Sequence, residues 1–117
     1  MLSNKLRTLL INAFATITST PNLITGDVTG ETLLSPPAGK KINIRGLTLA
    51  IEDGQTVYIK GGTTGTVYLP IYGNNFNKAG TSSDLNIKLE TDEELVVDIT
   101  GSSGKETFIG ISYRFID

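Results

Sequence analysis

The sequence predicts an all-β protein, a single β-sandwich of about seven or eight short antiparallel strands with an N-terminal arm. Its 117 residues match the size of one ordinary domain. The 13 glycines, together with abundant Thr, Ser and Asn, favour strands and tight turns over helices. Apolar residues alternate in short runs, which turn residues interrupt about every eight to twelve positions. A jelly-roll-like and an immunoglobulin-like arrangement both satisfy this pattern.

The N-terminal residues 1–20 fit two periods. One set of apolar residues follows helical spacing after a cap at Ser3, and another set alternates as in a strand. The β-branched run ATITST favours the strand. We divide the chain into residues 1–20, an arm or first strand, and residues 21–117, the sandwich domain. The arm has more apolar surface than one strand of a closed sandwich buries, so we expect it to contact a partner. Its candidate interface residues are Leu2, Leu6, Leu9, Leu10 and Phe14.

Residues 19–37 predict a strand region broken by turns. It ends at its two prolines, because proline cannot donate a hydrogen bond to a strand ladder. In the strand that follows, apolar residues alternate up to Ile44 and then, one place out of phase, again from Leu47. A strand that keeps its apolar side inward across such a slip needs a β-bulge. We predict this bulge at Gly46, with the glycine at positive φ.

The next two runs predict a β-hairpin. EDGQ at residues 52–55 is a turn sequence, Val57 and Ile59 mark a short strand, and residues 61–65 turn the chain again. The partner strand points three apolar residues inward, namely Val67, Leu69 and Ile71. Three tyrosines fall on the opposite faces, where they either contact a partner or pack beneath a neighbouring loop: Tyr58, Tyr68 and Tyr72.

The C-terminal third predicts the remaining strands. Residues 73–84 read as a long polar loop around Phe76, which either pins the loop to the domain or contacts a partner. Alternating runs follow at residues 85–89 and 95–99, and a last strand ends within two residues of the C-terminus. From the alternation we predict four core residues: Ile44, Leu49, Val97 and Ile111.

The composition argues against catalysis. The chain has no His and no Cys, so it lacks the usual general base, the commonest metal ligand and any thiolate metal site. We therefore predict no enzyme, no cofactor and no metal. The carboxylates of residues 92–98 are interpreted as solvated turn and edge charge rather than a calcium site, because alternate strand residues point to opposite faces. Residues 52–54, EDG, are an ordinary turn rather than half of a paired-carboxylate site.

Charge is distributed unevenly along the chain. The net charge is −2, with +3 in residues 1–45 and −5 in residues 46–117. Basic residues are too scattered for a nucleic-acid interface. Polar residues interrupt the apolar stretch near the N-terminus, which argues against a membrane span and a signal peptide. We expect a soluble protein that binds neither nucleic acid nor membranes.

Four segments resemble a family of small tailed-phage structural proteins. They are PAGKKINI at 37–44, LTLAIEDGQTVYIKGG at 47–62, TDEELVVDI at 91–99 and GISYRFI at 110–116. The order of these segments is similar to that in β-sandwich proteins related to head-decoration modules and to head- or tail-fibre modules. The resemblance covers roughly residues 22–116 and rests on structural motifs that carry no chemistry.

The resemblance implies a virion structural protein, made in the host cytoplasm and located on the capsid surface or the tail. The first expectation is a capsid decoration or cement protein, which binds the major capsid protein or another virion structural protein and stabilises the shell. It also implies a homo-oligomer, with a trimer favoured. The alternative is a receptor- or glycan-binding module of a head or tail fibre, which needs exposed aromatic side chains.

Overall fold

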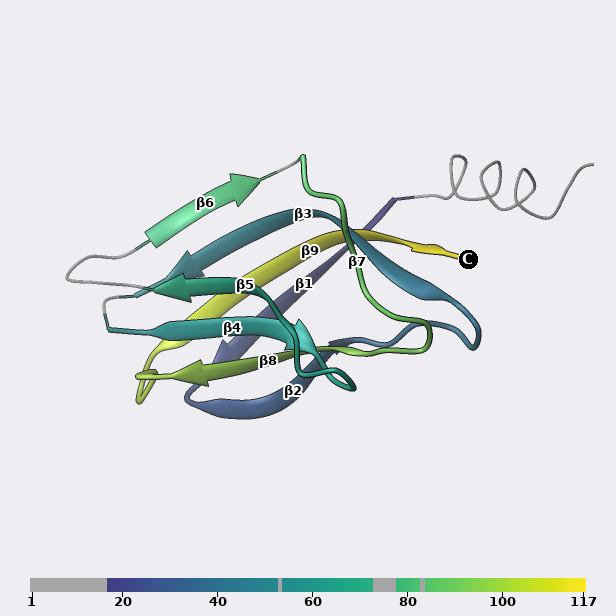
Figure 1. The fold of residues 1–117 in the computed structure, drawn as a ribbon. Coiled ribbons are helices and arrows are strands. Elements are labelled where there is room, and N and C mark those ends of the chain that lie inside the picture. The colour runs from purple at the N-terminus through teal and green to yellow at the C-terminus, as the bar shows by residue number, and fades with distance from the viewer. Residues whose placement is uncertain (1–16, 53, 73–77, 83) are drawn as a thin grey trace, which may run out of the picture.

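The computed structural model describes residues 17–52, 54–72, 78–82 and 84–117. These residues form two antiparallel sheets that pack face to face, with the chain passing repeatedly from one sheet to the other (Figure 1). The predicted all-β sandwich is therefore confirmed.

Nine strands make up the described part of the two sheets. Sheet A contains β1 (Thr18–Thr25), β3 (Lys41–Ile51), β6 (Lys78–Ser82), β7 (Ile87–Lys88) and β9 (Glu106–Ile116). Sheet B contains β2 (Val28–Leu34), β4 (Thr56–Gly61), β5 (Val67–Tyr72) and β8 (Leu95–Thr100). The predicted hairpin is the β4–β5 pair.

The strand order is that of a jelly roll. Sheet A runs β1-β9-β3-β6, with β7 paired to β3, and sheet B runs β2-β8-β4-β5. β1 therefore pairs with β9, β2 with β8, β3 with β6 and β4 with β5. The chain can thus be viewed as one long hairpin, in which the first four strands pair with later strands in reverse order. Its successive strand pairs lie alternately in sheet A and in sheet B, which is the arrangement of a jelly roll. Of the two predicted arrangements, the structure has the jelly roll.

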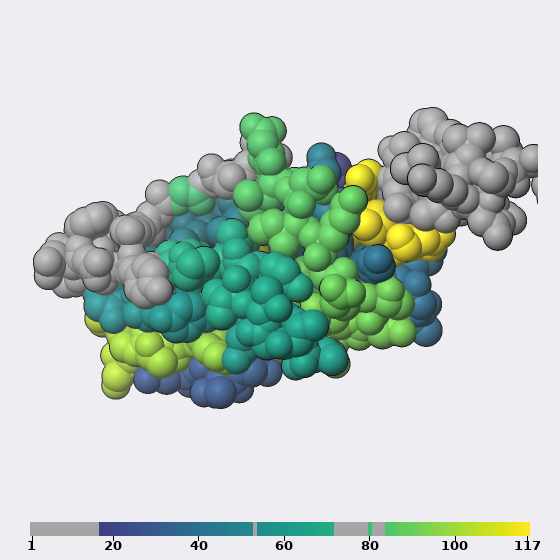
Figure 2. Space-filling view, in the orientation of Figure 1, coloured from purple at the N-terminus to yellow at the C-terminus, as the bar shows by residue number. Residues whose placement is uncertain are grey.

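Alternating side chains from both sheets build one core. Three of the predicted core residues, Ile44, Val97 and Ile111, are fully buried, and Leu49 is half-buried and packs against them. The other fully buried aliphatic side chains are Ile42, Val57, Ile59, Leu89, Leu95, Ile99 and Ile109. All except Leu89, which follows β7, come from β3, β4, β8 and β9, the inner strands of the two sheets. Figure 2 shows sheet B from outside, where teal β4 and β5 adjoin the green segment that leads into β8.

β3 has the predicted bulge. Against β9 its register passes from Ile44↔Tyr113 directly to Gly46↔Ser112, so Arg45 is the extra residue. The predicted positive φ at Gly46 is wrong, because this glycine is not among the positive-φ residues of the chain. The inserted residue alone restores the apolar side of the strand to the core, without a left-handed glycine.

Two predictions for the middle of the chain are wrong. The polar loop expected over residues 73–84 contains β6, which pairs with residues 47–51 of β3. This pairing satisfies backbone groups that the long strand β3 would otherwise leave without partners. Val67 was expected to point inward but is 45% exposed. The β4–β5 register shifts just after Ile59, so Val67 is opposite Lys60 on the outer face.

The first strand that the structure describes, β1, begins within the last three residues of the predicted arm and continues into the predicted domain. β1 begins at Thr18, opposite Tyr113 at the edge of sheet A. Residues 1–16, which hold most of the predicted arm, lie outside the described residues. The run at residues 85–89 keeps its expected alternation of burial but forms only the two-residue strand β7.

We predict that Ile111→Ala lowers the free energy of unfolding by about 2–4 kcal/mol, since it leaves a cavity between the sheets. Leu49→Ala should cost less, because Leu49 is only half-buried. Denaturant unfolding of both variants measures the effect. Val67→Ala, at a residue that is 45% exposed, is the control and should change stability by less than about 0.5 kcal/mol. A wild-type midpoint for Ile111→Ala would contradict the assigned core face.

Candidate functional site

The outward side of sheet A carries a patch without charged side chains, which we call the outer A face. Three neighbouring strands supply it, and their registers place its residues in rows: Pro21 is opposite Gly110, which is opposite Thr48, and Leu23 is opposite Phe108. The members of the outer A face are Ser19, Pro21 and Leu23 of β1, Phe108, Gly110 and Ser112 of β9, and Thr48 and Ala50 of β3.

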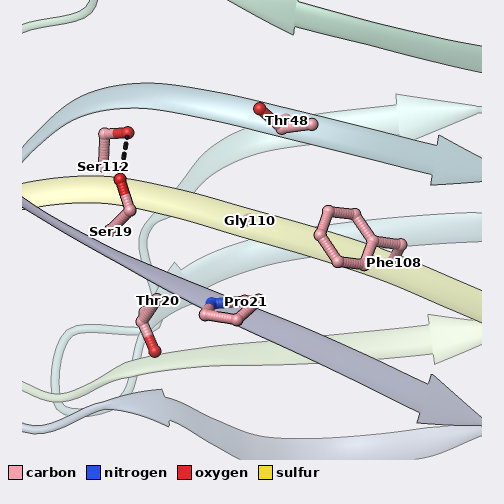
Figure 3. Close-up of a pocket in the computed structure, with 7 residues that line it drawn as sticks. All are labelled: Ser19, Thr20, Pro21, Thr48, Phe108, Gly110 and Ser112. Atoms are coloured by element: carbon pink, nitrogen blue, oxygen red, sulfur yellow. Dashed lines mark hydrogen bonds between the residues drawn. The ribbon is translucent and has the colours of Figure 1, made fainter.

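The outer A face is hollowed at its centre. Gly110 forms the floor of an open hollow of about 260 Å³, and Pro21, Thr48 and Phe108 stand around it (Figure 3). A side chain on Gly110 would touch its neighbours at once, since a Cβ there lies 3.4 Å from the Phe108 ring and 3.4 Å from the Cβ of Thr48. The missing side chain at this position therefore creates the hollow.

Exposed apolar surface borders this hollow. Leu23 is 65% exposed, a high value for a leucine in a strand, and Ile17, just before β1, is 55% exposed. At one end of the hollow, the hydroxyls of Ser19 and Ser112 are 3.2 Å apart and share a hydrogen bond, so they satisfy each other (Figure 3). The outer A face is thus suited to an apolar, uncharged binding partner.

Charged residues lie beyond the two ends of this patch. Along β9 the next outward residues are Glu106 on one side and Arg114 on the other. Arg114 Nε donates a 2.8 Å hydrogen bond to Asn43 Oδ1, and Asn43 in turn donates to the side chain of Asn86 at 2.9 Å. At the Arg114 end of the patch the polar side chains are therefore hydrogen-bonded to one another, whereas at the other end Glu106 is exposed.

The acidic segment has a structural role that its sequence does not reveal. Glu93 is only 1% exposed, so the interpretation of this carboxylate as solvated charge is wrong. It accepts hydrogen bonds from the backbone N–H of Thr64 at 2.6 Å, from that of Glu90 at 3.3 Å and from the Tyr68 hydroxyl at 3.2 Å. One carboxylate thereby joins the β4–β5 turn to the turn that precedes β8.

Gly61 makes room for this carboxylate. A Cβ on Gly61 would lie 2.5 Å from the carboxyl carbon of Glu93, closer than real atoms approach. The glycine in the GGTTG turn therefore matters for packing, because the buried carboxylate occupies the space that a side chain would take.

The other acidic residues of this segment also bind neighbouring strands and loops. Asp92 accepts a 2.6 Å hydrogen bond from the Gly39 N–H. Asp98 accepts from the Gly30 N–H at 2.7 Å and forms an ion pair with Lys60 at 2.7 Å. Glu94, the remaining acidic residue of this segment, accepts hydrogen bonds from the hydroxyls of Thr32 and Ser35.

Within the described ranges, no three acidic residues are grouped so as to hold a metal ion.

These contacts shift the ionisation of the groups involved. Burial alone would raise the pKa of Glu93, but the hydrogen bonds from Thr64, Glu90 and Tyr68 outweigh it, and the pKa lies below the usual value. Burial and the neighbouring Glu93 carboxylate raise the pKa of the Tyr68 phenol. The hydrogen bond from Lys60 lowers the pKa of Asp98. All three shifts arise from contacts that hold the fold together.

Of the predicted interface residues, the structure describes the side chains of Tyr58 and Tyr68. Tyr68 packs against the core and uses its hydroxyl on Glu93, whereas Tyr58 is half-buried on the outer side of sheet B. The side chain of Tyr72 is outside the described part of the structure. Five arm residues and one loop residue also lie outside it, namely Leu2, Leu6, Leu9, Leu10, Phe14 and Phe76.

Sequence reasoning missed the outer A face. Its signal was present in β9, where Phe108, Gly110 and Ser112 alternate with the core residues, and none of the three is charged. A strand with one solvated face usually has polar and charged residues at these positions. The absence of charge among the alternate, outward-facing residues of β1 and of the middle of β9 was therefore the sequence signal for this surface.

No protein-family model matches the chain, and no curated protein is similar to it. Within the described residues, no helix has the length and apolar character that a bilayer span requires.

We predict that Glu93→Gln lowers the free energy of unfolding by about 1–3 kcal/mol at neutral pH, because the amide loses part of the buried hydrogen bonding. The folded-state pKa of Glu93 is lowered, so its ionised form stabilises the fold above the unfolded-state pKa. This contribution is lost as the pH falls below about 5 towards the folded-state pKa. Denaturant unfolding across this pH range measures both effects.

Glu106→Gln is the matched control, since Glu106 is an exposed carboxylate of the same type. We expect it to retain the wild-type acid dependence, whereas Glu93→Gln should flatten it. Gly61→Ala should also destabilise the protein, because its Cβ would collide with the Glu93 carboxylate. Identical pH profiles for the wild type and Glu93→Gln would show that this carboxylate does not stabilise the fold.

Proposed function

We propose that this chain is a virion structural protein, and specifically a capsid decoration protein that binds the outside of a capsid shell. The observation that carries the proposal is the outer A face, an uncharged sheet surface with a central hollow at Gly110 and Leu23 65% exposed. Such a surface supports a function in binding, and it agrees with the structural motifs on which the phage resemblance rests.

The jelly-roll fold agrees with both the decoration function and the glycan-binding alternative. Jelly rolls occur in viral coat proteins and in lectins, and a fold alone does not determine a function. The distribution of polar groups adds to the argument. The carboxylates of residues 92–98 are engaged in hydrogen bonds to neighbouring turns and strands, so this acidic segment supports architecture rather than chemistry.

A decoration protein acts through the area that it buries. Copies that bind only the assembled shell stabilise it by mass action, because disassembly then requires their release. The partners in this proposal are the major capsid protein, or another virion structural protein, and further copies of this chain in a homo-oligomer, preferably a trimer. Cyclic symmetry lets one binding surface be used repeatedly at a symmetric site of a shell.

We predict that purified particles of the phage that encodes this chain carry it in hundreds of copies, as a decoration protein requires. Quantitative mass spectrometry against the major capsid protein measures the ratio, and particles without the protein should lose their genome at lower temperature. A few copies per particle, together with binding to host glycans, would instead favour the receptor-binding fibre module. Absence from purified particles would refute both functions.

A further inference from the structure

Three of the four edge strands of the described sheets are poorly suited to pairing with another copy. The edge strands β1 and β5 contain Pro21 and Pro70, and proline offers no amide hydrogen to an added strand. The edge strand β2 is irregular, because its register against β8 shifts twice. At these three edges, contact through a face of the sandwich is favoured over strand addition.

Of the two outward faces, that of sheet A is the one that requires an apolar partner. It combines the exposed Leu23 with the half-buried Phe108 and the hollow at Gly110. The outer side of sheet B instead carries the ion pair of Lys60 and Asp98, which is satisfied within the fold.

Residues 1–16 have the composition to fill this surface. At helical spacing their apolar residues fall on one side, and their charged side chains are Lys5 and Arg7, both basic. The exposed carboxylate of Glu106 lies just beyond the outer A face, where a basic side chain would be complementary. The apolar residues available for contact are Leu2, Leu6, Leu9, Leu10, Ala13 and Phe14.

The length of this segment is sufficient in either conformation. Sixteen residues span about 24 Å as a helix and about 50 Å when extended. The outer A face covers three strands, about 10 Å across, and about five residues along β1, roughly 15 Å. A single segment of this length therefore crosses the whole surface.

The chain of the same copy is badly placed to deliver its own segment. The hollow is lined by Ser19 and Pro21, only a few residues after Ile17, so the chain would have to reverse sharply there. Residues 15–20, ATITST, contain no Gly, Pro, Asn or Asp, and their β-branched side chains favour extended backbone. This preference favours an exit that leads residues 1–16 away from the hollow of their own copy.

From this placement we infer that the outer A face is the docking surface for residues 1–16 of a second copy of this chain. The inference rests on the homo-oligomer of the proposed function and names the contact that forms it. Because the segment and the outer A face are different surfaces, the contact is compatible with a head-to-tail ring such as the trimer of the proposed function.

Disulfide trapping tests the contact directly in the full chain, which has no native cysteine. The variant Phe14→Cys/Thr48→Cys should form disulfide-linked multimers under mild oxidation, because the first cysteine lies in the segment and the second borders the hollow. The control Phe14→Cys/Val67→Cys places the second cysteine at an exposed residue of sheet B and should give little product. Non-reducing electrophoresis separates products that join two chains from products within one chain.

A charge in the outer A face provides an independent test. Leu23→Glu replaces a side chain that is 65% exposed, so the fold should survive, while the dissociation constant of the homo-oligomer should rise at least about tenfold. Val67→Glu, the same kind of change on sheet B, should leave the dissociation constant unchanged. Sedimentation velocity over a concentration series measures both, and circular dichroism confirms the fold.

The outcomes separate the inference from the proposed function. A disulfide within one chain would overturn the assignment to a second copy, and trapping no better than in the Val67 control would overturn the docking surface. Equal sedimentation of the wild type, Leu23→Glu and Val67→Glu would overturn it as well. Trapping between chains in a protein that is absent from purified particles would support the inference while refuting the virion function.

Discussion

The structure depends on keeping one side of the paired strands β3 and β9 turned towards sheet B. Each of these strands has eleven residues, and β9 is flanked by β1 and β3. The apolar alternation of β3 shifts by one residue, and the insertion of Arg45 between two ladder pairs compensates for this shift. Without the insertion, the apolar side chains in the second half of β3 would face away from the core. Because the phase is restored, Ile51 reaches the same core as Ile44, and Thr48 and Ala50 remain on the outer A face.

A buried carboxylate fixes the end of the sandwich where two turns meet. Its acceptor oxygens satisfy the backbone N–H groups of Thr64 and Glu90, which lie in different turns. A carboxylate is costly to bury unless it is well hydrogen-bonded, and Glu93 meets that condition with three donors described above. The glycine opposite it and the tyrosine that donates to it are parts of the same arrangement, so the GGTTG turn and the TDEE turn form one structural unit.

The sequence predicted what depends on local alternation. The core side of β3, β8 and β9, the β4–β5 hairpin and the bulge in β3 follow from apolar periodicity, and the structure confirms them. It did not predict β6, because the residues KAGTS have no apolar alternation and pair only because β3 presents a free edge. The burial of Glu93 was missed for a related reason, since its donors come from Thr64 and Tyr68, which only the jelly-roll wrapping brings near.

The two outward faces of the sandwich differ in a way that bears on assembly. Sheet B has the usual solvated exterior of an antiparallel sheet, where Lys60 and Asp98 pair across neighbouring strands. Sheet A lacks charge at its centre on both sides, and a sheet of this kind is more typical of an inner layer. A proline in the edge strand β1 discourages addition of a further strand at that edge of sheet A. For this reason we propose the outer A face, rather than the tyrosines of the hairpin, as the surface that contacts a second chain.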